Sequence, residues 1–111
     1  MFASFHAEAL LYVGRFDEAD AVLAEAAAIG RSLGDHRLQA YAGWVAMRAA
    51  SMRGDAAATA RLAREVERHP GDWFDHPTGA EFLAEAAEAM ARVGDAGAAE
   101  GYAARASERR L

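Results

Sequence analysis

Three glycines at intervals of forty residues constrain the fold of this chain more than any other feature. They stand at Gly14, Gly54 and Gly94, and an alanine-rich, helix-forming stretch follows each of them. A fixed period in this range is typical of helical-repeat proteins, in which each pair of helices buries its apolar face only against its neighbours. The spacing therefore predicts an all-α fold, an α-solenoid of three antiparallel helical hairpins with turns at these glycines.

The apolar periodicity predicts one helix on each side of every glycine turn, six in all. Aspartates stand where the predicted helices begin, at Asp35 and Asp55, and we expect them to be N-caps. Pro77 suits the first turn of the fifth helix, where an N–H donor is not needed. The predicted helices end at Gly14, at about Leu33, before Gly54, before Pro70-Gly71, at Val93 and at the C-terminus, and an irregular piece runs from His69 to Pro77.

The core is expected to consist of closely packed helices with a few large anchors. Hydrophobic residues make up 53% of the chain, but alanine supplies most of them. We expect Leu23, Leu62, Leu83 and Met90 to be buried between helices. On the second helix the expected inward stripe is Ala19, Val22, Leu23, Ala26 and Ile29, and on the sixth it is Ala98, Ala99, Tyr102, Ala103 and Ala106.

The charge and residue types exclude several kinds of function. The net charge is -5, which argues against a surface for nucleic acid, because such a surface must be basic. Arginine supplies every positive charge other than histidine, so the chain has no P-loop lysine and no Schiff-base lysine. There is no cysteine, which excludes disulfides and thiolate chemistry. With no membrane-spanning run visible, we expect a soluble cytoplasmic protein.

The turn and the small residue five positions later resemble the tetratricopeptide repeat. This pattern is formed by Gly14 with Ala19 and by Gly94 with Ala99, and Thr59 takes the place in the middle unit. Leu23 and Ala26 match the large and small positions of that family's second helix, and Ala63 with Val66 and Ala103 with Ala106 match them more weakly. The likeness covers residues 1–111, which we expect to be a single domain and a piece of a longer array.

The period of forty, together with the stretch from Ala28 to Asp35, is similar to the helical-repeat segment of large bacterial ATP-dependent LuxR-type regulators. In those proteins the resemblance implies a sensor and assembly module between an ATPase and a DNA-binding domain. It therefore implies a non-catalytic protein-interaction or signal-sensing scaffold, with a role in transcription regulation.

The first helix of each hairpin lines the concave groove of a tetratricopeptide-like array, and this implies a set of groove residues. We expect Arg48 to pair with acids, and Glu85 and Glu88 to receive a basic residue of a partner. Trp44 has an alternative place in the core, because a large aromatic between alanines fills the space between packed helices. The candidate groove residues are Glu8, Tyr12, Tyr41, Trp44, Arg48, Met52, Glu85, Glu88 and Arg92.

The expected partner is a protein or peptide segment, or a neighbouring domain of the same polypeptide. A clamp for peptide C-termini is disfavoured, because the chain has neither the lysines nor the asparagines that such a groove uses. The alternative is a small-molecule effector site, which would need an enclosed volume of roughly 300 Å³ or more. No direct contact with nucleic acid or membrane is expected.

The histidines and acids between the fourth and fifth helices raise the question of a metal. His69, Asp72, Asp75 and His76 are close in sequence, but they include no rigid ligand pair, and the aspartates are ordinary turn and cap residues. We expect no metal there, and we expect His6 and His36 at helix surfaces or ends. No catalytic motif is present, so neither an enzyme nor a cofactor is expected.

The first helix has no visible N-cap, and its large apolar residues point to more than one face. These residues are Phe2, Phe5, Leu11 and Tyr12. We expect apolar surface there that neighbouring repeats cover in a longer protein, and self-association into a homo-oligomer when the chain is alone.

Overall fold

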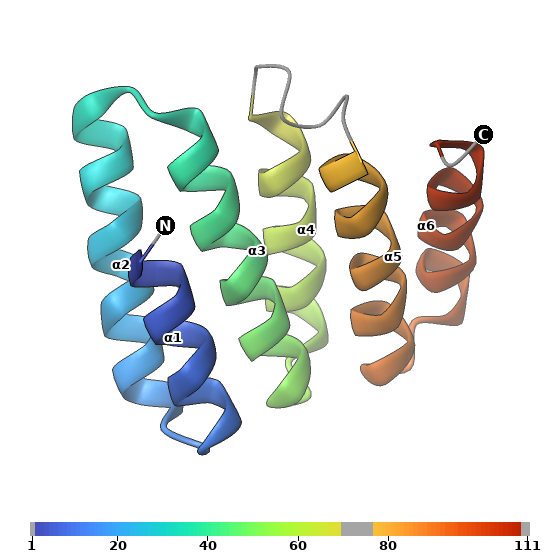
Figure 1. Ribbon diagram of the computed structural model, residues 1–111. Helices are drawn as coiled ribbons and strands as arrows, with labels where there is room; N and C mark the ends of the chain where they lie inside the picture. Colours follow the sequence, from blue (N-terminus) through green and yellow to red (C-terminus); the bar gives the residue numbers. More distant parts are fainter. Residues whose placement is uncertain (1, 70–76, 110–111) are drawn as a thin grey trace.

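The computed structural model describes residues 2–69 and 77–109, with side chains from His6 onward. All regular structure in these ranges is helical, which confirms the all-α prediction. Figure 1 shows the helices standing side by side, with α1 and α2 at one end of the row and α6 at the other. They are α1 (Phe2–Tyr12), α2 (Phe16–Leu33), α3 (His36–Met52), α4 (Ala56–Arg68), α5 (Pro77–Arg92) and α6 (Ala96–Arg109).

The same turn joins α1 to α2, α3 to α4 and α5 to α6. Gly14, Gly54 and Gly94 have φ angles of 78°, 76° and 85°, a left-handed conformation that glycine adopts without a Cβ clash. In each turn the glycine N–H donates to the carbonyl three residues earlier, and the next N–H donates to the carbonyl five residues earlier. The predicted turn positions are therefore confirmed.

Aspartates cap the helices where the sequence predicts them. The carboxylates of Asp35 and Asp55 accept the N–H groups of Leu38 and Ala58 at 3.0 Å, and Asp95 caps α6 in the same way. The residue that corresponds to Asp55 in the first turn is Arg15, which makes no side-chain cap and instead forms a surface ion pair with Glu18.

Helix α3 is the centre of the molecule, because it packs against α1, α2, α4 and α5. Two apolar clusters meet on it. The larger contains Trp44, Met47, Phe82, Leu83 and Met90 and joins α3, α4, α5 and α6. The smaller joins α1, α2 and α3 and is built mostly of alanines around the side chains of Leu10, Leu11, Leu23 and Val45.

Three of the four predicted anchors are buried: Leu23, Leu83 and Met90 are at most 4% exposed. Leu62 is only partly buried, because its side of α4 borders a hollow described below. Leu11 is 2% exposed, so its predicted place on an open face is wrong, whereas Tyr12 is 78% exposed. The side chains of Phe2 and Phe5 lie outside the described residues.

The predicted inward stripes of α2 and α6 are too wide. Ile29 is 46% exposed, Val22 is half-buried and Ala103 is exposed. The physical reason is that α2 packs mainly on α1 and α3, and α6 mainly on α5, so each buries only a narrow stripe.

None of the helices that the structure describes is both long and apolar enough to cross a membrane.

Candidate functional site

An open cleft of about 410 Å³ runs across α1, α3 and α5. Seven of the nine predicted groove residues line it, together with Ala89, and Tyr41 and Trp44 do not. We refer to this hollow as the cleft, and its lining consists of Glu8, Tyr12, Arg48, Met52, Glu85, Glu88, Ala89 and Arg92.

Most of the lining forms two rows of side chains that cross the three helices. Glu8, Arg48 and Glu88 are separated by forty residues each and form one row. The second row lies four residues, about one helical turn, further along each helix, at Tyr12, Met52 and Arg92. The sequence spacing thus places residues of three different helices at one site.

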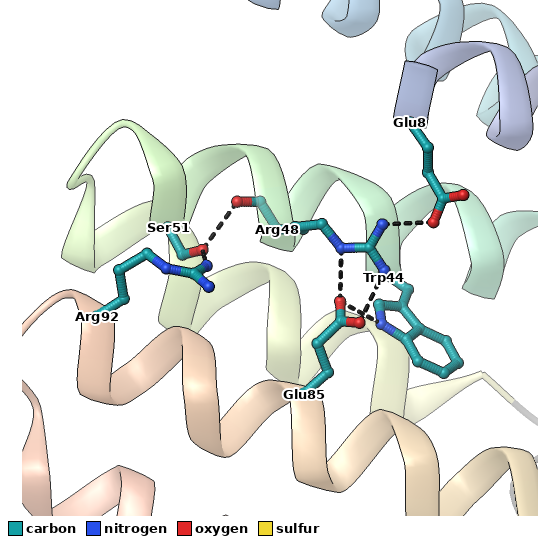
Figure 2. A network of polar contacts seen from close by, with 6 residues as sticks. All are labelled: Glu8, Trp44, Arg48, Ser51, Glu85 and Arg92. Atoms are coloured by element: carbon teal, nitrogen blue, oxygen red, sulfur yellow. Dashed lines mark hydrogen bonds and ion pairs between the residues drawn. The ribbon is translucent and has the colours of Figure 1, made fainter. Parts of the chain in front are cut away.

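Arg48 ties the cleft together by pairing with two acids on two helices (Figure 2). Its Nε donates to Glu85 Oε2 at 2.9 Å, its Nη2 donates to Glu85 Oε1 at 2.7 Å, and its Nη1 donates to Glu8. The Arg48 side chain is only 19% exposed, so this two-pronged pair is shielded from solvent much better than a surface ion pair. Arg48 therefore holds α1 and α5 against α3.

The pKa of Arg48 reflects the same contacts. Partial burial lowers the pKa of the guanidinium, but the hydrogen bonds with Glu85 and Glu8 more than offset this, and the pKa is raised above its ordinary value. Arg48 stays charged at any working pH and is already satisfied by its own chain. The expectation that Arg48 and Glu85 wait for charges of a partner is therefore corrected, because they pair with each other.

Trp44 takes the core alternative. It is 8% exposed, and its ring packs against that of Phe82 in a T-shaped arrangement with a centroid distance of 5.4 Å. Its indole N–H donates to Glu85 Oε2 at 2.7 Å, which satisfies the buried donor and orients a cleft carboxylate (Figure 2). Tyr41 is half-buried and stacks on Trp44, with ring centroids 5.9 Å apart. Trp44 therefore supports the cleft through Glu85, and Tyr41 packs on Trp44.

Arg92 and Ser51 add a contact that sequence reasoning missed. Arg92 Nη1 donates to Ser51 Oγ at 2.6 Å, and Ser51 Oγ donates to the carbonyl oxygen of Arg48 at 2.8 Å (Figure 2). Ser51 is 1% exposed. A lone serine in an apolar helix was the available signal, but serine often bonds its own helix backbone, so the signal did not indicate an arginine partner.

Glu88 and Arg92 retain binding capacity. Among the residues that the structure describes, neither forms an ion pair, and the only hydrogen bond of Arg92 is with neutral Ser51. Tyr12 and Met52, which are 78% and 40% exposed, line the same cleft. An exposed aromatic side chain next to unpaired charges is a combination found at interaction surfaces.

A second hollow of about 290 Å³ lies between α2, α3 and α4. Ala42, Gly43 and Ala46 belong to α3, and the remaining lining is half apolar and half polar. Those other residues are Asp20, Leu23, Ala24, Ala27, Arg31, Gln39, Leu62, Glu65, Val66 and His69.

Two histidines that are distant in sequence come together at the start of α3 and the end of α4. Nδ1 of His36 lies 3.4 Å from Nδ1 of His69. Burial lowers the pKa of His69, and the nearby His36 lowers it further, whereas Glu65 opposes the shift. His36 is exposed and begins α3, as predicted, but its contact with His69 was not predicted. Asp72, Asp75 and His76 lie outside the described residues.

The cleft can bind, because it offers a carboxylate, a guanidinium and two apolar side chains on a support that the Arg48 contacts hold in place. Compared with known proteins, the chain matches no family model, no curated protein and no solved structure.

Proposed function

We propose that this chain is a tetratricopeptide-like α-solenoid of three hairpins that binds a polypeptide segment of a protein partner in the cleft. The segment carries an arginine or lysine next to an apolar side chain. One observation carries the proposal: exposed Tyr12 and Met52 share an open cleft with Glu88, a carboxylate that no described residue neutralises.

The charge of the cleft favours a basic segment. Three carboxylates, of Glu8, Glu85 and Glu88, face two guanidinium groups, of Arg48 and Arg92. Arg48 already holds Glu8 and Glu85, so Glu88 is the acid that receives a cation. The net charge of -5 adds a long-range attraction for the same kind of partner.

The remaining lining favours a polypeptide over a compact ion. Arg92 keeps N–H donors that suit a peptide carbonyl, and Tyr12 and Met52 offer apolar contact area on two neighbouring helices. Tyrosine gives such area at a small loss of side-chain entropy, and methionine adapts to irregular shapes. An extended or helical segment laid across α1, α3 and α5 reaches all of them.

The wider role that we propose is an assembly or sensing module of a bacterial LuxR-type transcriptional regulator in the cytoplasm. Support comes from the turn that recurs at Gly14, Gly54 and Gly94 with the same hydrogen bonds, and from the side-by-side placement of α1, α3 and α5. The partner is then another protein or a neighbouring domain of the same polypeptide.

A small-molecule effector is the second candidate, and the volume of the cleft favours it. About 410 Å³ exceeds the roughly 300 Å³ at which small-molecule sites begin. Against it stands the openness of the cleft to solvent, which leaves much of a small ligand uncovered.

A peptide-display selection with the full chain tests the proposal. We expect selected peptides to combine a basic residue with an aromatic or aliphatic one. Tyr12→Ser should weaken their binding about tenfold, as for a hot-spot aromatic, and Glu88→Gln about two- to fivefold, as for a rim ion pair. Val13→Ser and Glu100→Gln are matched controls, because both residues are exposed and neither lines the cleft.

Two results would count against the proposal. One is selected peptides whose binding the cleft variants leave unchanged. The other is a failed selection together with a metabolite that raises the melting temperature of the wild-type chain but not of Glu88→Gln or Arg92→Gln, which would establish the small-molecule alternative.

A further inference from the structure

We propose that His36 and His69 form a two-imidazole binding site for a divalent transition metal of the Zn²⁺ type. The site is independent of the proposed partner cleft, because His36 begins α3, whereas the cleft residues of that helix, Arg48 and Met52, lie near its end.

The fold brings the two rings together for a local reason at each helix end. Asp35 caps α3, so the helix begins at His36. His69 is the C-cap residue of α4, with its N–H bonded to the carbonyl oxygen of Val66. Because the Gly54 turn reverses the chain, the start of α3 lies beside the end of α4, as Figure 1 shows.

The separation of the nitrogens suits a shared metal. The Nδ1 atoms of His36 and His69 are 3.4 Å apart. Two imidazole nitrogens bound at about 2.0–2.1 Å to one tetrahedral zinc ion are about 3.3–3.4 Å from each other. The ring centroids are 5.6 Å apart and the ring planes are tilted by 50°, so the two Nδ1 atoms face each other between the rings. A rotation of each ring about its Cβ–Cγ bond aims both lone pairs at one point.

The chemistry of the ligands selects the metal class. Neutral imidazole binds Zn²⁺, Cu²⁺ and Ni²⁺ well, whereas Mg²⁺ and Ca²⁺ prefer oxygen ligands. The described residues contain no group of three or more potential ligands, so among them this pair contributes two ligands to the metal. Without metal, the 3.4 Å contact is an N–H···N hydrogen bond, in which one ring carries its proton on Nδ1.

The experiment is a calorimetric titration of the full chain with Zn²⁺, with Mg²⁺ as the comparison. We expect one Zn²⁺ per chain, and a loss of affinity of about tenfold or more in both His36→Gln and His69→Gln, since each variant removes half of the protein ligands. His6→Gln is the matched control, because His6 is exposed and lies on α1. Mg²⁺ should not bind at this pair.

Nitrogen NMR of the imidazoles gives a second readout that does not depend on folding stability. Zn²⁺ should shift the Nδ1 resonances of His36 and His69 and leave those of His6 in place. The proposal is overturned by a titration without heat, by Zn²⁺ affinity that survives in His36→Gln, or by shifts confined to Nε2. None of these outcomes bears on peptide binding in the cleft.

Discussion

The two hollows of this molecule lie against the same helix and differ in what their walls offer. The cleft collects side chains of α1, α3 and α5, most of them charged, and exposes Tyr12 at 78%. The hollow between α2, α3 and α4 has Ala42, Gly43 and Ala46 on its α3 side. The cleft is held in shape by Arg48, which bonds to α1 and α5, whereas small residues leave the other hollow open.

The difference shows that volume alone does not identify a binding site. The hollow between α2 and α4 is what remains when two helices flank a third that carries glycine and alanine. In the cleft, residues that stand forty positions apart on three helices converge. The charge of Arg48 is paired with Glu8 and Glu85, whereas Glu88 forms no ion pair with a described residue. We therefore propose the cleft, and not the other hollow, as the place where a polypeptide partner binds.

The largest expected loss of stability comes from truncating a large side chain beneath the cleft, and it should exceed the loss from truncating one beside the other hollow. Phe82→Ala should lower the free energy of unfolding by about 3–5 kcal/mol, because Phe82 is 0% exposed and contacts Trp44 beneath the cleft. Leu23→Ala should fall in the lower half of the roughly 2–5 kcal/mol range, because Leu23 borders the other hollow, which is open to solvent, so its truncation leaves no closed cavity. Urea unfolding measures both, and equal losses would contradict the difference in packing.

Removing Arg48 should have the next largest effect. Arg48→Met leaves the partly buried carboxylates of Glu8 and Glu85 without their cation, and we expect a loss of about 1–3 kcal/mol in unfolding free energy. Arg15→Met is the control, because the Arg15–Glu18 pair is more than half exposed and should contribute less than about 1 kcal/mol. A loss no greater than that of the control would show that Arg48 does not hold the cleft in shape.

Gly43→Ala tests whether the second hollow is bounded by tight packing. A Cβ at Gly43 would come within 2.8 Å of Val66 Cγ2, which calls for a shift of the Val66 side chain or of α4. Such overpacking costs about 1–3 kcal/mol, and the better helix propensity of alanine returns about 1 kcal/mol. We expect a net destabilisation on the order of 1 kcal/mol by thermal unfolding. A stabilised variant would mean that the hollow takes up the methyl group freely.

The smallest effect is expected away from both hollows, at Tyr102. Partial burial and the neighbouring Glu67 raise the pKa of the Tyr102 phenol to about 12. Between pH 10 and pH 12 Tyr102 is therefore protonated in the folded chain but ionised in the unfolded chain, whose pKa is about 10. The contribution of Tyr102 to the free energy of unfolding is thus fully present below pH 10 and is lost as the pH rises toward 12. Ultraviolet absorbance should show one of the three tyrosines ionising last, and Tyr102→Phe should remove that step.

The sequence predicts the turns and caps of this molecule well because local chemistry determines them. A left-handed turn needs glycine whatever its surroundings, and an N-cap carboxylate bonds its own helix, so Gly54 and Asp55 specify their structure unaided. The burial of Ile29 and Ala103 was predicted wrongly, because periodicity gives the apolar face of a helix but not the width that its neighbours cover.

Most of the cleft lining was implied by the resemblance to the tetratricopeptide repeat, whose groove is lined by the first helix of each hairpin, and what escaped prediction depended on pairing in space. Glu8, Arg48 and Glu88 stand forty residues apart in the sequence, and the structure places them on three helices around one cleft. The pairing of Arg48 with Glu85 depends on how far α3 and α5 are shifted along each other, which the sequence does not specify. The meeting of His36 with His69 depends in the same way on how two helix ends align.

The most direct test of partner binding in the cleft is to map, by NMR, where a selected basic peptide contacts the full chain. We expect the methyl signal of Met52 and the backbone signals of Tyr12, Glu88 and Arg92 to move together as peptide is added, while those of Gly43 and Leu62 stay in place. Perturbations concentrated on α2 and α4, around Ala27, Leu62 and Val66, would contradict binding in the cleft and would assign it to the other hollow.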